Sequence, residues 1–128
     1  MSRIKSKNTA PEIIVRRFLF ANGFRFRLHQ KNLPSKPDIV LKKYKTVIFV
    51  HGCFWHGHEG CKYFVIPKTR TEWWINKIVR NKELDHFNTE RLSILGWNII
   101  TVYECELKKE KIEATLNSLI TTLRESEQ

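Results

Sequence analysis

A stretch of twelve residues, VHGCFWHGHEGC (50–61), concentrates the side chains of this sequence that can do chemistry. It holds three of the five histidines and two of the three cysteines, and it directly follows an apolar run. Imidazoles transfer protons and bind metals near neutral pH, and thiolates are ligands for soft metal ions. The segment therefore predicts a metal site, an acid–base centre, or both.

Four side chains form a candidate zinc site. Cys53, His58 and Cys61 are separated by four and then two residues, and Cys105 comes far along the chain, just after the last apolar run. Thiolates combined with an imidazole are a common tetrahedral zinc set, and sulfur ligands disfavour magnesium and calcium. We expect these four residues to hold one structural zinc. The alternative is three ordinary buried thiols beside a surface histidine.

Two more histidines of the stretch, His51 and His56, are left for other chemistry. Asp38 opens a short strand that we expect to pair with the strand ending at Val50, so its carboxylate should face the Val50–His51 end. A carboxylate beside two imidazoles suits phosphodiester hydrolysis, because it can hold a divalent metal that polarises the phosphate and activates water. One histidine would take or position the water's proton, and the other would neutralise or protonate the leaving oxygen.

The acids also have ordinary structural interpretations. Glu12 lies three residues after Thr9, as the partner in a helix-capping box would, and an aspartate after a proline is typical of a turn or strand start. Only the whole set of groups, with Glu12 as a candidate second acid beside Asp38, favours a catalytic site.

The overall composition indicates an anionic partner. The chain has 128 residues, with 23 Lys and Arg against 13 Asp and Glu. The resulting net charge of +10 favours nucleic acid, with a merely basic protein as the alternative. We expect one domain over residues 1–128, in the cytoplasm, with no secretory signal. We also expect no membrane segment, because no apolar run reaches the roughly 18 residues of a membrane helix.

The elements that must position these groups follow from periodicity and turn signals. Helices are predicted at 9–21, at 71–95 with a break near Asn81, and at 109–123. Strands are predicted at 24–28, 38–41, 46–50 and 97–103, with the second and third forming a hairpin. This order predicts a mixed α/β sheet flanked by helices, and the helical crossover places the last strand parallel to a central one.

Aromatic residues flank the candidate centres. Phe54 and Trp55 lie in the twelve-residue stretch, and Trp73 and Trp74 open the second helix. In a basic protein such rings can wedge between base steps and unstack them. The alternative is core packing, which we expect for one of Trp73 and Trp74, because adjacent helical residues cannot face the same way.

Four blocks of the sequence, LPSKPDIV, VIFVHGCFWHGH, PKTRTEWWINKI and LGWNIITVYECEL, resemble the very short patch repair endonucleases, the Vsr family. The likeness runs from SRIKSKNTAPE to about Leu107. It implies a bacterial, nucleoid-associated DNA repair enzyme with a restriction-endonuclease-like fold. The implied reaction is Mg²⁺-dependent hydrolysis of one DNA strand 5′ of the thymine in a T:G mismatch, which arises by deamination of 5-methylcytosine.

The resemblance also implies roles for individual residues. Asp38 and the backbone carbonyl of Val50 would coordinate catalytic magnesium, and His51, His56 and Glu12 would complete the catalytic site. The implied ligands of the structural zinc are Cys53, His58, Cys61 and Cys105. The implied DNA-wedging aromatics are Phe54, Trp55 and Trp74.

Two other functions stay open from the sequence. One is a related nicking or restriction endonuclease without mismatch dependence, and the other is a zinc-containing DNA-binding module without catalysis. The expected partners are double-stranded DNA with a T:G mismatch and proteins of the repair pathway. A monomer is the simpler expectation, because a nick needs one active site. Residue types do not specify the bases around the target or a companion methyltransferase.

Overall fold

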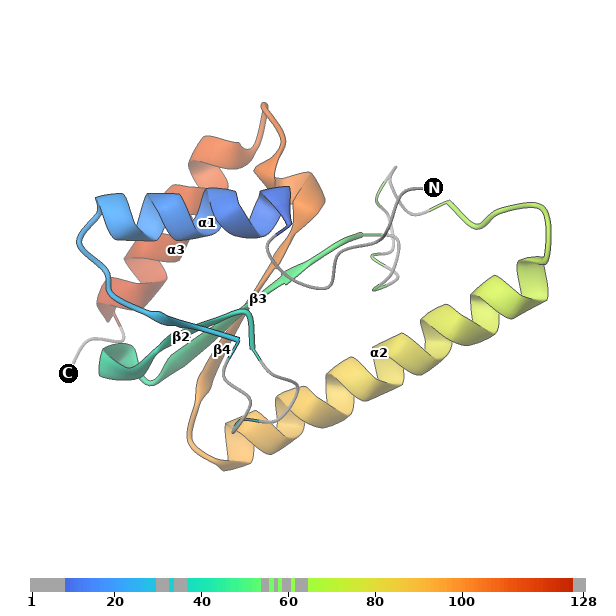
Figure 1. Ribbon diagram of the computed structural model, residues 1–128, viewed down its shortest axis with the longest axis horizontal. Coiled ribbons are helices and arrows are strands. Elements are labelled where there is room, and N and C mark those ends of the chain that lie inside the picture. Colours follow the sequence, from blue (N-terminus) through green and yellow to red (C-terminus); the bar gives the residue numbers. More distant parts are fainter. Residues whose placement is uncertain are drawn as a thin grey trace.

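The computed structural model gives three helices and four strands within the residues it describes (Figure 1). The helices are α1 (Ala10–Ala21), α2 (Thr71–Ile94) and α3 (Ile112–Glu125). The strands are β1 (Arg27–Leu28), β2 (Ile39–Leu41), β3 (Thr46–His51) and β4 (Asn98–Tyr103). Two 3-10 helices are η1 (Lys42–Tyr44) and η2 (Glu104–Leu107). The described residues are 9–29, 33, 37–53, 56, 58, 61 and 65–125.

The strands form one mixed sheet in the order β1-β2-β3-β4. β1 pairs with β2 and β2 with β3 in antiparallel fashion, whereas β3 and β4 run parallel after the crossover through α2. The predicted hairpin, the parallel last strand and the mixed α/β class are thereby confirmed. The parallel register ends at His51 opposite Tyr103, so the segment after β3 and the 3-10 helix η2 start at the same sheet edge.

Helices cover both faces of this sheet, and alternating side chains feed two cores. Figure 1 shows α1 and α3 on one face and α2 on the other. Because successive strand residues point to opposite faces, neighbours in β2 and β3 join different cores. The first core takes Ile39, Leu41 and Ile48 of the strands together with Val15, Leu19, Leu119 and Leu123 of the helices. The second consists of Val40, Val47, Phe49 and Leu92.

Helix α1 begins and ends where its local signals indicate. The Thr9 side chain accepts a hydrogen bond from the Glu12 backbone N–H at 3.4 Å, and Pro11 lies in the first turn, where its missing N–H costs nothing. The helix ends at Asn22, and Gly23 follows with a φ of +87°, a conformation that glycine adopts without strain. This places Glu12 on the buried side of α1, with 2% of it exposed.

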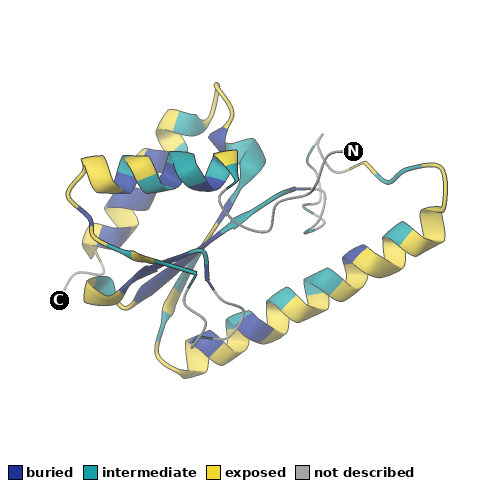
Figure 2. Ribbon diagram, viewed as in Figure 1, coloured by how far each residue is buried: buried dark blue, intermediate teal, exposed yellow. Residues whose placement is uncertain are grey.

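Helix α2 is continuous through Asn81, so the predicted break there is wrong. Its 24 residues contain neither glycine nor proline, the usual causes of an interruption. Only its C-terminal part, at Leu92, packs into the second core, and Figure 2 shows that much of the helix is exposed. None of the helices in the described residues is long and apolar enough to cross a membrane.

The boundaries of three other elements differ from the predicted ones. β1 pairs only over Arg27–Leu28, and the Phe24 N–H donates instead to the Leu19 carbonyl of α1 at 3.0 Å. β4 starts at Asn98, since the Trp97 N–H donates to the Leu92 carbonyl at 3.1 Å and belongs to the turn after α2. α3 starts at Ile112 rather than residue 109, because Lys108 to Lys111 form a turn closed by a 2.8 Å backbone bond.

Leu92 should be the main anchor of α2 on the sheet, because it is fully buried in the second core. Leu92→Ala is expected to lower the free energy of unfolding by about 2–4 kcal/mol through lost burial and a residual cavity. Denaturant unfolding followed by circular dichroism measures this. Ile94→Ala is the matched control, because Ile94 is 84% exposed and should change stability by less than about 0.5 kcal/mol. Equal losses in the two variants would contradict the proposed packing of α2.

Candidate functional site

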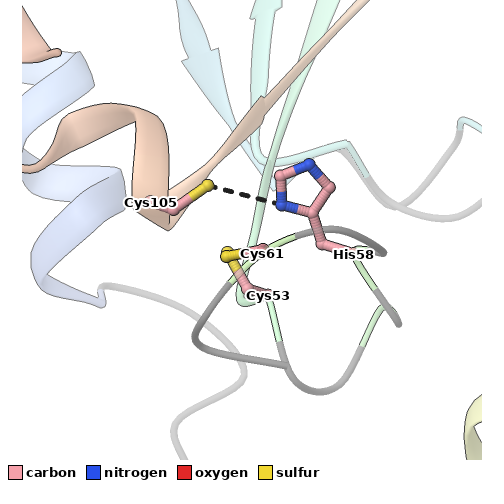
Figure 3. A group of neighbouring side chains, drawn as sticks. All are labelled: Cys53, His58, Cys61 and Cys105. Carbon is pink, nitrogen blue, oxygen red and sulfur yellow. Dashed lines mark hydrogen bonds between the residues drawn. The ribbon is translucent and has the colours of Figure 1, made fainter. Parts of the chain in front are cut away.

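The structure brings the four predicted zinc ligands together at the edge where β3 and β4 end. Cys53 and His58 are joined by a turn in which the His58 N–H donates to the Cys53 carbonyl at 2.9 Å, and Cys105 comes from η2. The ligand atoms of Cys53, His58, Cys61 and Cys105 all lie within 4.8 Å of one another. Figure 3 shows the three sulfurs and the imidazole converging, with the Cys105 Sγ 3.3 Å from His58 Nδ1.

The chemistry of this cluster fits a zinc ion. Zinc–sulfur bonds of about 2.3 Å and zinc–nitrogen bonds of about 2.0–2.1 Å in a tetrahedron separate sulfur from nitrogen by roughly 3.5 Å, close to the observed 3.3 Å. Burial, followed by contacts with Cys105 and Cys61, raises the pKa of Cys53 to about 12. Burial and Cys61 likewise raise the pKa of Cys105. These raised pKa values favour the protonated thiols in the metal-free protein. A bound cation would favour the thiolates instead, because thiols that coordinate a metal are deprotonated.

The His58 imidazole is also oriented by an aromatic ring. Tyr103, the last residue of β4, stacks on it with ring centroids 3.9 Å apart and planes at 6°. This contact fixes the plane of the ring beside the three sulfurs. A donor set that is both gathered and pre-oriented makes the cluster a plausible metal site.

His51 and His56 form a second group, which includes an acid that the sequence did not reveal. Their rings stack with centroids 3.6 Å apart and planes at 3°. His56 Nδ1 lies 2.6 Å from Oδ2 of Asp85, a residue of α2. A carboxylate can only accept in such a bond, so His56 Nδ1 carries the proton and its Nε2 is left for other partners. Stacked planes also disfavour one shared metal ion, because each ring binds metals within its own plane.

The two imidazoles of this pair are electrostatically different. Burial, and then the neighbouring His56, lower the pKa of His51 to about 4, so this ring is neutral at physiological pH. Its Nδ1 is buried and has no hydrogen-bond partner among the described residues. His56, by contrast, has the Asp85 carboxylate at hydrogen-bond distance. The pair therefore offers one neutral ring and one carboxylate-supported ring at the same place.

Asp38 lies at the neighbouring strand end, and its carboxylate reaches across to β3. Its Oδ2 accepts a hydrogen bond from the Val50 N–H at 2.7 Å, so the carboxylate lies one residue from His51. Extending the β2–β3 register by one step places Asp38 itself opposite Phe49. Burial, and to a lesser degree the nearby Glu12 carboxylate, raise the pKa of Asp38 to about 6.

Glu12 points from α1 into the same region. Its Oε2 lies 2.7 Å from Arg16 Nη2 and 3.0 Å from His29 Nε2, so the buried carboxylate faces these two side chains. Ligand atoms of Glu12, His29 and Asp38 lie within 4.8 Å of one another. Like Asp85, His29 escaped the sequence prediction.

The predicted aromatic contacts lie partly outside the described residues, as Phe54 and Trp55 do. Trp74 is half-buried near the start of α2 and makes an edge contact with Trp73 at 4.7 Å, and Trp73 is 46% exposed. Neither ring belongs to the two cores formed by the described residues, so the core packing expected for one of them stays a prediction. The first turns of α2 extend past the sheet (Figure 1).

Sequence comparison relates this chain to a known family. Residues 1–62 match the family described as DNA mismatch endonuclease Vsr. The type II nicking enzyme V.NmeAIP of Neisseria meningitidis serogroup A is 48% identical, over 98% of this chain and 90% of that enzyme. The type II nicking enzyme V.XorIIP of Xanthomonas oryzae is 45% identical, over 94% and 88%. The DNA mismatch endonuclease Vsr of Escherichia coli K12 is 43% identical, over 88% and 72%.

Bacterial enzymes whose names describe DNA nicking or mismatch cleavage are thus similar to this chain over most of its length. The chain belongs to the Vsr DNA mismatch endonuclease family. The resemblance found in the sequence motifs is confirmed, and a DNA-binding module without catalysis is disfavoured. The relatives' names describe strand nicking twice and mismatch cleavage once, so they support nicking more broadly than mismatch dependence.

The raised pKa of Asp38 leads to a pH-dependent stability. In the metal-free protein, ionising this half-buried carboxylate costs free energy, so stability should fall as pH rises from about 4 to about 6. Asp38→Asn removes that charge and should raise the free energy of unfolding at about pH 8 by roughly 1–3 kcal/mol. Denaturant unfolding at several pH values measures the difference, which should shrink toward about pH 4.

Glu90→Gln is the control for this experiment, because Glu90 is an exposed acid of α2 whose carboxylate lies 3.1 Å from the exposed His86 ring. It should leave the pH profile of stability unchanged. If Asp38→Asn were less stable than the wild type at about pH 8, the claim that ionised Asp38 destabilises the metal-free protein would be contradicted.

Proposed function

We propose that this protein nicks one strand of duplex DNA by cation-dependent hydrolysis of a phosphodiester bond. The observation that carries the proposal is the meeting of a half-buried carboxylate with a stacked histidine pair. Asp38 bonds to the Val50 N–H, and the next residue, His51, stacks on His56. A carboxylate and imidazoles are groups that can serve this reaction, and the net charge of +10 suits a DNA substrate. Membership of a DNA endonuclease family supplies independent support.

The cation site is proposed to consist of the Asp38 carboxylate and the Val50 carbonyl, with Mg²⁺ as the expected ion. The N–H and C=O of one strand residue point to the same side, and the Val50 N–H points at Asp38. The Val50 carbonyl therefore faces the same space as the carboxylate. A divalent ion bound there would polarise the scissile phosphate and lower the pKa of a bound water.

The histidine pair is proposed to accept a proton from the attacking water and to hydrogen-bond the phosphate or the leaving oxygen. The His56 Nδ1–H donates to Asp85, so a neutral His56 presents Nε2 as an acceptor for a proton of the attacking water. His51 is held neutral by burial and by His56, so it can hydrogen-bond a phosphate or leaving oxygen without repelling its neighbour. Glu12 would serve as a second acid at the cation side of the site.

The four-residue cluster is proposed to hold a structural zinc. Zinc bound by Cys53, His58 and Cys61 would fix the segment that carries His56 against η2, which supplies Cys105. Metal binding can supply several kcal/mol of ordering free energy to such a segment. We infer a restriction-endonuclease-like domain over residues 1–128 in which zinc supports the reacting edge and does not take part in the chemistry.

The substrate is duplex DNA, and a T:G mismatch is its proposed preferred form. The family description and the Escherichia coli relative name mismatch cleavage. A net charge of +10 suits phosphate contacts, and Trp74, with Phe54 and Trp55, would wedge into the distorted duplex. The second candidate is nicking without mismatch dependence, which the names of the Neisseria and Xanthomonas relatives favour.

Removing the Asp38 carboxylate should abolish nicking. With Mg²⁺ and a labelled duplex, Asp38→Ala is expected to cut at least about 100-fold more slowly than the wild type, because the cation loses its side-chain ligand. His86→Ala is the matched control, since His86 is an exposed histidine of α2 that contacts Glu90. An Asp38→Ala protein that nicks at the wild-type rate would contradict the proposed mechanism.

Mismatch selectivity is tested by substrate pairs. Duplexes that differ only in a T:G or a C:G pair should be nicked at rates at least about tenfold apart if distortion of the mismatch lowers the cost of unstacking. Single-turnover rates on both duplexes, in several flanking sequences, measure the ratio. Equal rates in every context would reject the T:G assignment and leave general nicking as the activity.

A further inference from the structure

The end of β1 brings a histidine to the proposed cation site. β1 and β2 pair with Leu28 opposite Ile39, so His29 lies opposite Asp38 one step further along. The His29 N–H indeed donates to the Asp38 carbonyl at 3.3 Å. Residues directly opposite in an antiparallel pair project their side chains to the same face of the sheet. His29 and Asp38 are therefore neighbours by backbone register as well as by side-chain position.

The backbone of His29 is held in an unusual conformation. Its φ is +46°, in the left-handed region that non-glycine residues rarely adopt. Such a conformation costs free energy, and it persists where surrounding contacts require it. Here the ring nitrogen Nε2 reaches the buried Glu12 carboxylate at 3.0 Å. The strained residue is thus the one that places an imidazole between two acids.

The resulting group has the composition of a mixed nitrogen–oxygen metal site. One ligand atom each from Glu12, His29 and Asp38 lies within 4.8 Å of the other two. Glu12 is almost fully buried, and its Oε2 also lies 2.7 Å from Arg16 Nη2. Two acids at a buried edge gain from a divalent ion between them, and the imidazole adds a nitrogen ligand at the same point.

We propose that His29 is a cation-selecting ligand, so that the site formed with Glu12 and Asp38 binds manganese and similar transition-metal ions in preference to magnesium. The inference rests on the proposed cation-dependent function and specifies its metal. Magnesium prefers oxygen ligands and retains its waters, whereas imidazole is a good ligand for first-row transition metals. A histidine serving only as a structural partner of Glu12 would leave this preference unchanged.

Metal binding measured directly tests the proposal. Mn²⁺ is titrated into the zinc-loaded protein at about pH 8, where a free imidazole is neutral, and unbound Mn²⁺ is followed by electron paramagnetic resonance. Mg²⁺ affinity is obtained by competition. In His29→Gln, Mn²⁺ affinity should fall roughly tenfold while Mg²⁺ affinity changes less than about threefold. Thiolate-bound zinc stays in place, because Mn²⁺ is the weaker binder of the two at such sites.

A second measurement observes the ligand itself. Pulsed electron paramagnetic resonance of bound Mn²⁺ should show coupling to an imidazole nitrogen in the wild type and lose it in His29→Gln. His86→Gln is the control, because it removes an exposed histidine from α2 and should change neither signal nor affinity. The proposal would be overturned if the wild type showed no nitrogen coupling, or if the coupling survived in His29→Gln. It would also be overturned if His29→Gln lost affinity for Mn²⁺ and Mg²⁺ equally.

Asp38→Ala separates this inference from the proposed function. It should abolish binding of both ions, because it removes the carboxylate that any cation there requires. Tight binding of both ions by Asp38→Ala would show that the proposed nuclease site is misplaced, whatever His29 does. Loss of both ions in Asp38→Ala, with an unchanged preference in His29→Gln, would leave the nuclease proposal standing and reject the role of His29.

Discussion

The parallel pairing of β3 with β4 is the constraint on which both centres depend. Its register runs from Thr46 opposite Asn98 to His51 opposite Tyr103, and both strands end together. The chain after β3 therefore enters the space next to η2, which brings Cys105 to the cluster of Cys53, His58 and Cys61. If β3 shifted by one residue along β4, each of its side chains would point to the opposite face of the sheet. The residues that follow β3 would then no longer lie beside η2.

The same edge concentrates interactions that are unfavourable in the absence of cations. Burial raises the pKa of Asp38 and of the cluster thiols Cys53 and Cys105, and burial together with the stacked His56 lowers the pKa of His51. The left-handed backbone of His29 adds local strain. The two helix-covered cores flank the strands that carry these groups. Local instability of this kind is what the proposed cation-binding catalytic site would be expected to show.

Much of this arrangement could be predicted from local sequence signals. Thr9, Pro11 and Gly23 define the first helix, and the close spacing of Cys53, His58 and Cys61 identifies three members of the cluster. Cys105 is predicted as the fourth member because the strands of a parallel pair end at the same edge of the sheet. Each of these predictions uses residues close in sequence or a simple rule of topology.

The contacts that escaped prediction join elements distant in sequence. Asp85 lies in the middle of α2, and nothing in its helical surroundings indicates that His56 is its partner. His29 needs the exact β1–β2 register, which a strand of two residues does not reveal in advance. The break expected at Asn81 failed for a different reason, since a polar residue without a proline or glycine nearby does not end a helix. The positions of Asp85 and His29 depend on the length of α2 and on the strand register, which local sequence signals do not specify.

The central claim is that three thiolates and one imidazole fasten the segment carrying His56 to η2, beside the carboxylate of Asp38. X-ray absorption at the zinc edge of the purified protein tests it most directly. We predict a first shell of three sulfurs at about 2.3 Å and one nitrogen at about 2.0–2.1 Å. A shell of oxygen and nitrogen alone, or protein that carries no zinc at all, would contradict the account.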